Sequence, residues 1–513
     1  MCDHAHTAGR YANIRPVAER LSGLDSSFLH LEEGDTHMHV ASTTLFAGPA
    51  PPYLEFRDHI ASRLHLVPRF RQKLRFVPFS QGRPVWVDDP HLNLAYHVRH
   101  TSLPPPGSEE QLRRLAARIF SQRLDRSKPL WELWLVEGLS GGRFAIVGKT
   151  HHCLVDGISG VDITTVLFDL EREPDTPHAD EPEAWLPEPE PNDSHLLAEA
   201  LVERAVSPRE IFRGARWVLR GPRRALDKVT DSLAAAGSFA WAGIAAPASP
   251  FNVEIGPHRK FTWVRASLRD LKQVKDELGG TVNDVVLAAV SGALGRYLRS
   301  HGHSTAGLEL RAMVPVSVRS ADQEGALGNQ LTAMMATLPV WCEDPVRRLH
   351  LVSESMGDLK ESKQAMGATL LTQLADFAPP TLAGQAARLQ SRQRFFNLVV
   401  TNVPGPQFPL FLMGRRMLRV FPMVPLAKRQ ALCVGIMSYD GQVNFGLIGD
   451  YDAMPDLDDL GRDLEASLAE LGEAAGGRRS IFRRFVSGER KREEIGDRQN
   501  GAGGEQRQGT TST

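Results

Sequence analysis

The stretch that decides the fold is KTHHCLVDG, residues 149–157. Apolar residues before it, Phe144 and Ile146 among them, predict a strand that ends at the two histidines, and apolar residues recur at helical spacing after the glycine. Successive side chains of a strand point to opposite faces, so His151 and His152 cannot both face one pocket. We therefore expect one histidine to be buried and the other to be presented at the end of the strand.

The residues after the histidines suit a tight turn that leads into a helix. Asp156 is placed to hold this turn or to pair with an arginine elsewhere, and Gly157 can adopt backbone conformations that other residues resist. The following helix would direct free N–H groups back towards the loop. A neutral imidazole is the usual general base for a hydroxyl proton, and no G-x-S-x-G nucleophile elbow lies anywhere that matters to the site. These features favour direct attack by an activated alcohol over a covalent enzyme intermediate.

Other interpretations fit the same residues. A histidine pair is often a packing or surface feature and not a catalytic one. A metal site of His151, His152 and Asp156 is disfavoured, because adjacent strand residues diverge and no third ligand is suitably spaced. Cys153 could suggest a thiol nucleophile, but the apolar Leu154 beside it favours a buried, inert thiol.

The composition is that of a globular protein with a large core. Hydrophobic residues make up 42% of the 513 residues and charged residues 24%, and this length favours two or three domains. The net charge of -1 counts against a nucleic-acid binder, because phosphate neutralisation needs a basic surplus. No apolar run approaches the roughly 20 residues of a transmembrane helix, and no signal-peptide core is visible. The four cysteines are dispersed, which supports neither a disulfide scaffold nor a zinc site. We therefore expect a cytoplasmic protein.

Strands and helices alternate along the folded parts of the chain. A capping box at 108–111 opens a helix, and a buried strand at 131–137 is joined to the strand before the histidines by the turn at 140–142. Further on, Val282 to Leu298 reads as a long helix, and Asp440-Gly441 predicts a hairpin turn. A leucine-rich helix at 457–471 closes the folded part.

Two stretches between these parts differ in charge. Residues 171–193 hold nine acidic residues and six prolines, which cannot build a packed element, so we expect an exposed linker. The stretch 209–224 holds six arginines, and a helix would place four of them on one face with apolar residues around them.

Several motifs together identify a family resemblance. HHCLVDG matches the H-H-x-x-x-D-G pattern of the CoA-dependent acyltransferase superfamily. Six other stretches, in the same order, resemble the bacterial wax ester synthase/diacylglycerol acyltransferase family over about residues 20 to 470. They are Leu21–Phe28 with His37–His39, Pro129–Glu132, Gly256–Arg259, Thr281–Asp284, Thr401–Pro406 and Ser438–Gly441.

The resemblance implies an α/β fold of two chloramphenicol-acetyltransferase-like domains with the active-site channel between them. It implies an enzyme that esterifies diacylglycerol or a long-chain fatty alcohol, with acyl-CoA as co-substrate and with no metal or tightly bound cofactor. His152 would be the general base, His151 its supporting residue and Asp156 a structural anchor, with Gly157 as motif support. Asn283 and Asp284 match the family's N-D pair near the channel, and their role is left open.

The resemblance also sets the expected domain boundaries. They are an extension at 1–19, an N-terminal acyltransferase domain at 20–170, the linker and basic helix at 171–256, a C-terminal acyltransferase-like domain at 257–475, and a disordered tail at 476–513. Within the first domain, Pro129–Glu132 is better explained by core packing than by substrate contact. His37 and His39 could equally stabilise the domain or bind substrate.

The sequence alone leaves two rival functions open and also predicts a location. The chain could be a condensation-type acyltransferase that uses another acyl carrier or acceptor, or a non-catalytic protein that binds lipids or lipid droplets. Because the implied substrates are nearly insoluble, we expect peripheral association with the inner face of the cell membrane or with lipid droplets. The arginines of 209–224 would attract an anionic lipid surface while apolar side chains insert.

Overall fold

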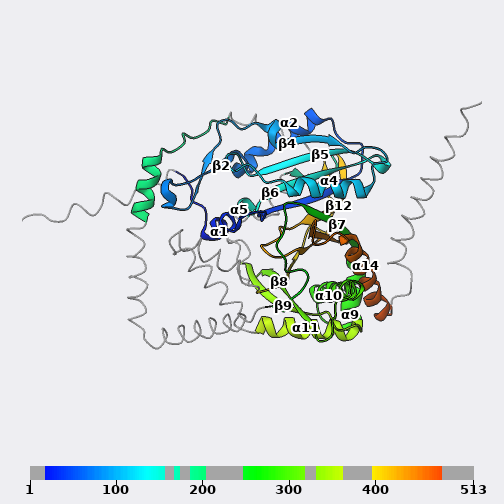
Figure 1. Cartoon of the computed structure of the whole chain (residues 1–513). Coiled ribbons are helices and arrows are strands. Elements are labelled where there is room, and N and C mark those ends of the chain that lie inside the picture. The colour runs from blue at the N-terminus through cyan, green and yellow to red at the C-terminus, as the bar shows by residue number, and fades with distance from the viewer. Residues whose placement is uncertain are drawn as a thin grey trace, which may run out of the picture.

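The computed structural model describes residues 18–155, 167–173, 185–203, 246–317, 331–361 and 395–476. Asp156, Gly157, the basic stretch 209–224 and most of both predicted terminal segments lie outside these residues. Two six-stranded sheets and one two-stranded hairpin make up the strand content that is described (Figure 1).

The first sheet has the strand order β11-β12-β1-β6-β5-β4. Its neighbours are antiparallel except for the parallel pair β4 and β5. The strands are β1 (His39–Phe46), β4 (Val98–Ser102), β5 (Trp131–Leu139), β6 (Arg143–His151), β11 (Phe411–Leu412) and β12 (Arg415–Met423). The predicted turn between β5 and β6 is confirmed, with Gly141 at a φ of 75°, a region that glycine enters without steric cost.

The second sheet has the order β7-β14-β13-β10-β8-β9, and its parallel pairs are those that β10 makes with β13 and β8. The strands are β7 (Arg259–Ser267), β8 (Glu309–Ser317), β9 (Leu331–Pro339), β10 (Leu398–Val403), β13 (Leu432–Tyr439) and β14 (Gln442–Asp450). The predicted hairpin turn joins β13 to β14, with positive φ at both Asp440 and Gly441. A separate hairpin pairs β2 (Gln72–Arg75) with β3 (Val85–Asp88).

Several helices begin at a residue whose side chain caps them. The predicted box is present at α4, where the Ser108 side chain accepts from the Gln111 backbone and the Gln111 side chain accepts from the Ser108 backbone. The helices are α1 (Gly23–Leu31), α2 (Tyr53–Arg63), α3 (Leu94–His97), α4 (Glu109–Ser121), α5 (His152–Val155), α9 (Leu268–Leu278), α10 (Val282–Ser300), α11 (Pro345–Glu361), α14 (Leu457–Ala474) and 193–203. Four 3-10 turns accompany them: η1 (Leu64–Leu66), η2 (Pro68–Arg71), η3 (Pro78–Ser80) and η4 (Ser140–Gly142).

Two strands of the second half join the first sheet, and the two halves share a core. β11 and β12 fall inside the range 257–475 predicted for the second domain, but β12 pairs with β1 in the first sheet. Trp263 of β7 stacks on Phe421 of β12 at 4.4 Å between ring centroids. These rings belong to a buried cluster that also includes Leu45 and Val147 of the first sheet. Apolar burial therefore holds the halves together. The predicted boundary at residue 257 did not anticipate that strands of the second half would lie in the first sheet.

Among the helices that the structure describes, none is by itself long and apolar enough to cross a membrane, although α9 and α10, bent by 97°, meet that criterion as a pair.

Candidate functional site

The two histidines of the motif lie on either side of a change in secondary structure. β6 ends at His151, and α5 begins at His152. His151 is opposite His39 in the antiparallel register with β1 and has only 1% of its surface exposed, whereas His152 is partly exposed. The expectation of one buried and one presented histidine is therefore confirmed.

The contacts of His151 define where its ring proton lies. Its Nδ1 accepts a hydrogen bond from the backbone N–H of Cys153 at 3.1 Å, and a backbone N–H can only donate. Nδ1 must then be unprotonated, so a neutral His151 carries its proton on Nε2. That Nε2 lies 3.2 Å from a carboxylate oxygen of Glu32, which is placed to accept the proton's hydrogen bond. The neighbouring Cys153 thiol is buried, as the sequence predicts.

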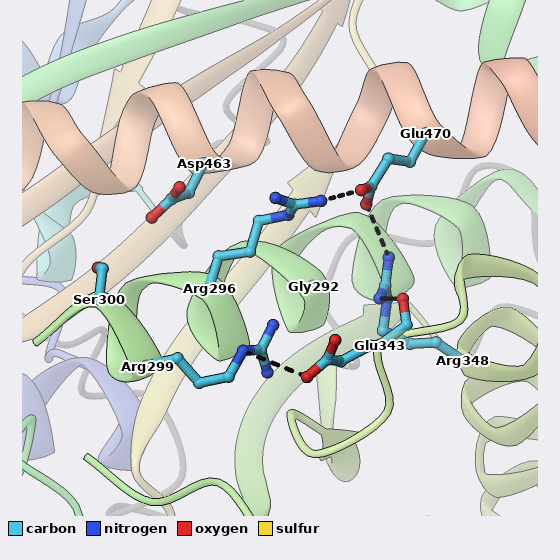
Figure 2. Close-up of a pocket in the computed structure, with 8 residues that line it drawn as sticks. All are labelled: Gly292, Arg296, Arg299, Ser300, Glu343, Arg348, Asp463 and Glu470. Carbon is cyan, nitrogen blue, oxygen red and sulfur yellow. Dashed lines mark hydrogen bonds and ion pairs between the residues drawn. The ribbon is translucent and has the colours of Figure 1, made fainter. Parts of the chain in front are cut away.

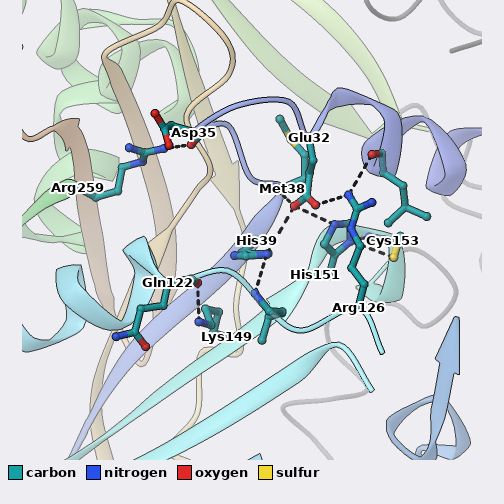
Figure 3. A network of polar contacts seen from close by, with 12 residues as sticks. Glu32, Asp35, Met38, His39, Gln122, Arg126, Lys149, His151, Cys153 and Arg259 are labelled. Carbon is teal, nitrogen blue, oxygen red and sulfur yellow. Dashed lines mark hydrogen bonds and ion pairs between the residues drawn. The ribbon is translucent and has the colours of Figure 1, made fainter. Parts of the chain in front are cut away.

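Glu32 is a buried carboxylate with several donors around it (Figure 3). It accepts from the Met38 backbone N–H at 2.7 Å and pairs with Arg126, while the His39 ring lies 3.6 Å away. Burial would raise the pKa of Glu32, but hydrogen bonding from His151 and from the Met38 N–H outweighs it and holds that pKa well below its usual range. Glu32 is therefore a stable anion beneath the histidine pair.

His37 and His39 stack on one another at 4.5 Å, and both are buried. Burial lowers the pKa of His37 to about 3, with the charge of Arg259 acting in the same direction. Burial also lowers the pKa of His39 well below its usual value. Both rings are therefore neutral near neutral pH and stabilise the first half as packed side chains.

His152 is held by contacts from two other segments. Its backbone N–H donates to the Met38 carbonyl at 2.8 Å. Its ring stacks on Phe28 of α1, with centroids 4.0 Å apart and an angle of 29° between the planes. Figure 1 shows α1 and α5 side by side at one end of the first sheet. A partly exposed imidazole with a fixed backbone suits a general base that must meet a substrate hydroxyl.

The second half contacts the segment that joins Glu32 to Met38. Arg259, at the start of β7, donates to the Asp35 carbonyl at 2.7 Å, and the Lys428 ammonium pairs with Glu33 at 3.0 Å. The Arg259 side chain is completely buried and also lies 3.8 Å from the Asp450 carboxylate. Residues of both halves therefore fix the segment that supports the histidine pair.

Another buried cation, Lys149, lies two residues before His151 in the sequence. Lys149 is fully buried, and its ammonium donates to the carbonyls of Ile119 at 3.0 Å and Gln122 at 2.8 Å. Burial lowers the pKa of Lys149, which the nearby Glu132 at 3.4 Å opposes. Trp131 beside that glutamate is buried and stacks on Phe70, which confirms core packing for the Pro129–Glu132 stretch.

The N-D pair begins α10 in the second half. The Asp284 carboxylate accepts from the Thr281 backbone at 2.8 Å in a capping box, so its local role is to start the helix. The Asn283 side chain accepts from the Asn402 amide of β10 at 3.2 Å. These contacts connect two of the motifs to one another and not to His152.

One polar pocket of about 410 Å³ lies away from these motifs, between α10, α14 and the segment before α11 (Figure 2). Its three arginines are Arg296, Arg299 and Arg348, and each pairs with Glu470 or Glu343. The pocket contains none of the predicted site residues, so we do not place the reaction there. In the part of the chain with described coordinates, no group of three or more His, Cys, Asp or Glu residues is placed to hold a metal ion.

Sequence reasoning missed three residues that the structure brings to the histidines. Phe28 lies within α1 and Glu32, four residues on, is its C-terminal cap, but nothing local indicates that these two side chains meet the histidines. Arg259 lies in a recognised motif, yet its buried contact with Asp35 joins positions more than 200 residues apart. Asp156 and Gly157 of the predicted site lie outside the described residues, so their roles stay predictions.

Comparisons with known proteins identify a family. Two family models match the chain: the wax ester synthase/diacylglycerol acyltransferase catalytic domain over residues 21–286, and the C-terminal domain of the same family over residues 327–472. A Mycobacterium tuberculosis protein named as a probable diacylglycerol O-acyltransferase is 35% identical over 475 residues, which cover 90% of this chain and 98% of that protein.

Solved structures extend the comparison to the fold. The wax ester synthase/diacylglycerol acyltransferase from Marinobacter aquaeolei VT8 is similar with a TM-score of 0.63 and 29% identity, over 89% of this chain and 100% of that one. A variant of the starter condensation domain of rhizomide synthetase, in complex with C8-CoA, gives a TM-score of 0.51 at 13% identity, over 90% and 95% of the two chains. The second likeness concerns the fold alone. The predicted α/β fold class is confirmed.

Proposed function

The chain belongs to the wax ester synthase/diacylglycerol acyltransferase family and is an acyltransferase, and we propose that it uses acyl-CoA to esterify diacylglycerol or a long-chain fatty alcohol. The observation that supports the chemistry best is the presentation of His152. Its neighbour His151 is buried, with Nδ1 bonded to the Cys153 N–H and Nε2 3.2 Å from the Glu32 carboxylate, while His152 begins α5 and is partly exposed. Acyl-CoA enters this proposal as co-substrate, and no other cofactor is invoked.

The proposed reaction is a direct transfer in which His152 is the general base. Its imidazole takes the proton of the acceptor hydroxyl while the oxygen attacks the thioester carbonyl. When the tetrahedral intermediate collapses, the carbon–sulfur bond breaks, and the protonated imidazole gives its proton to the departing thiolate. General acid–base catalysis of this kind contributes about 10²–10⁴-fold, so the positioning of both substrates must contribute much of the remainder.

The test replaces His152 by Ala and follows labelled ester formation from a long-chain acyl-CoA and diacylglycerol. We expect a loss of about 10²-fold or more, because the proton acceptor is gone. His303→Ala is the matched control, since this histidine is exposed beyond α10 and should leave the rate unchanged. Undiminished ester formation by the His152 variant would remove the basis of the proposed mechanism.

The choice of acceptor and acyl carrier is tested separately. One acyl-CoA is offered with diacylglycerol and with several long-chain alcohols, and the release of free CoA is measured for each. Transfer only from a carrier-bound thioester would favour the condensation-type alternative, with which this chain shares its fold. Binding of acyl chains by folded protein without CoA release would favour a non-catalytic lipid-binding protein.

We also propose that the protein works at a lipid surface as a peripheral, cytoplasmic enzyme on the inner membrane face or on lipid droplets. The support is the chemistry of the substrates and the arginine-rich stretch 209–224. Replacing Arg213, Arg216 and Arg220 by Gln should weaken sedimentation with anionic vesicles. Activity on a short, soluble acceptor should remain. Equal sedimentation of the triple variant and the unchanged protein would contradict this docking stretch.

A further inference from the structure

One helix, α1, contacts both histidines of the motif. Phe28 stacks on the His152 ring at 4.0 Å, and the Glu32 carboxylate lies 3.2 Å from His151 Nε2. The two residues are four positions apart, Phe28 within the helix and Glu32 at its C-terminal cap. Residues with this spacing lie on the same helix face, so one face of α1 meets both rings.

The position of α1 is itself held at both ends. The Ser22 side chain accepts from the Asp25 backbone at the N-terminus. At the C-terminus, Arg126 donates to the Leu29 carbonyl at 3.1 Å and also pairs with Glu32. Because Arg126 bonds both the helix end and the carboxylate, the face that meets the histidines cannot rotate freely.

The contacts of α1 continue through the backbone to His152. Glu32 accepts from the Met38 N–H at 2.7 Å, and the Met38 carbonyl accepts from the His152 N–H at 2.8 Å. His151, whose Nε2 lies 3.2 Å from the Glu32 carboxylate, is covalently joined to His152. Glu32 therefore contacts both Met38, which binds the His152 N–H, and His151, which precedes His152 in the chain. Figure 3 shows Glu32 between Met38 and His151.

We propose that Phe28 and Glu32 are positioning residues for the acyl transfer: Phe28 restricts the His152 ring to one orientation, and Glu32 fixes the His151 ring and the turn into α5. Neither side chain takes the hydroxyl proton, so neither is a catalytic residue. This inference rests on the proposed role of His152 as general base. It assigns to α1 the alignment of that base, where a displacement of about 1 Å can cost on the order of 10²-fold in rate.

The test compares variants of the full chain with a long-chain acyl-CoA and diacylglycerol as the assay substrates. Phe28→Leu removes the stacked ring and keeps an apolar side chain, whereas Phe28→Tyr keeps the ring. Glu32→Gln keeps the shape and removes the charge. Glu110→Gln is the matched control, because this exposed carboxylate pairs with Arg114 of the same helix, α4.

We expect Phe28→Leu and Glu32→Gln to lower kcat by about 10- to 100-fold while KM for acyl-CoA stays within about twofold, because alignment of the base and not binding is lost. Phe28→Tyr should recover most of the rate, and Glu110→Gln should match the unchanged protein. If Phe28 and Glu32 were purely structural, their variants would contain less folded enzyme, and the folded fraction would keep its kcat and KM. Circular dichroism measures that folded fraction.

The inference is wrong if folded Phe28→Leu retains kcat within about twofold, or if Phe28→Tyr is no better than Phe28→Leu. The partly exposed Phe28 decides the matter even if Glu32→Gln fails to fold. Measuring His152→Ala in the same assay separates a failure of the proposed function from a failure of the positioning role. An active His152→Ala variant would overturn the proposed function, whereas an inactive one beside fully active α1 variants would overturn only the positioning role.

Discussion

Replacing Arg259 by Met should weaken the whole protein, because this side chain joins the two halves from a fully buried position. Its guanidinium donates to the carbonyls of Gly256 at 2.5 Å, His258 at 3.1 Å and Asp35 at 2.7 Å. Methionine fills most of the volume but leaves these acceptors without their donor. It also leaves the Asp450 carboxylate buried without a nearby positive charge.

The expected loss follows from these contacts. Removing one partner of a buried ion pair costs about 3–5 kcal/mol. We expect the lower end for Arg259→Met, because Asp450 keeps backbone donors from Gly256 at 2.8 Å and Ala453 at 3.0 Å. A loss of about 3 kcal/mol is a large part of the 5–15 kcal/mol typical of folded domains.

Urea unfolding followed by tryptophan fluorescence measures the effect, because Trp263 lies at the contact between the halves. Arg429→Met is the matched control: this arginine is 55% exposed, and its pair with Glu254 at 3.5 Å should contribute less than about 1 kcal/mol. If the Arg259 variant loses no more unfolding free energy than the control, the argument that this residue holds the halves together is refuted.

Four other substitutions test the fold locally. Ser108→Ala removes the N-cap of α4 and should cost about 1 kcal/mol in urea unfolding, and no change would contradict the capping box. Gly405→Ala places a Cβ 2.3 Å from the Ser438 carbonyl oxygen and should destabilise the folded protein by about 1–3 kcal/mol. Gly357→Ala, in helix α11 with nothing within 4 Å of the added Cβ, should instead stabilise the folded protein by about 0.5–1 kcal/mol. His37 has its pKa lowered by burial from 6.5 to about 3, so the unfolded chain binds a proton in that pH window that the folded protein does not. Stability should therefore fall as pH drops from 6.5 towards 3, and His37→Gln should flatten this slope in urea titrations at several pH values; an unchanged slope would show that His37 is not buried neutral.

Much of the local structure was predictable because its causes lie within a few residues. The capping box at Ser108 and the turn at Asp440-Gly441 depend on side chains and backbone angles of immediate neighbours. The division of roles between His151 and His152 follows from the alternation of side chains along a strand and from the helix that begins after it. The ordered motifs added the family, which the comparisons confirm.

The surroundings of the histidines were decided by tertiary structure. Nothing in the residues near Glu32 shows that its carboxylate meets His151, because that contact requires α1 and β6 to pack together across about 120 positions. The same holds for Arg259 and Asp35, and for β12, which pairs with β1 although the two strands are more than 370 positions apart. Short-range interactions determine helices, turns and the direction of side chains along a strand. Which strand neighbours which, and which charge is buried beside which ring, depends on the free energy of packing the whole chain, and only the folded structure contains that result.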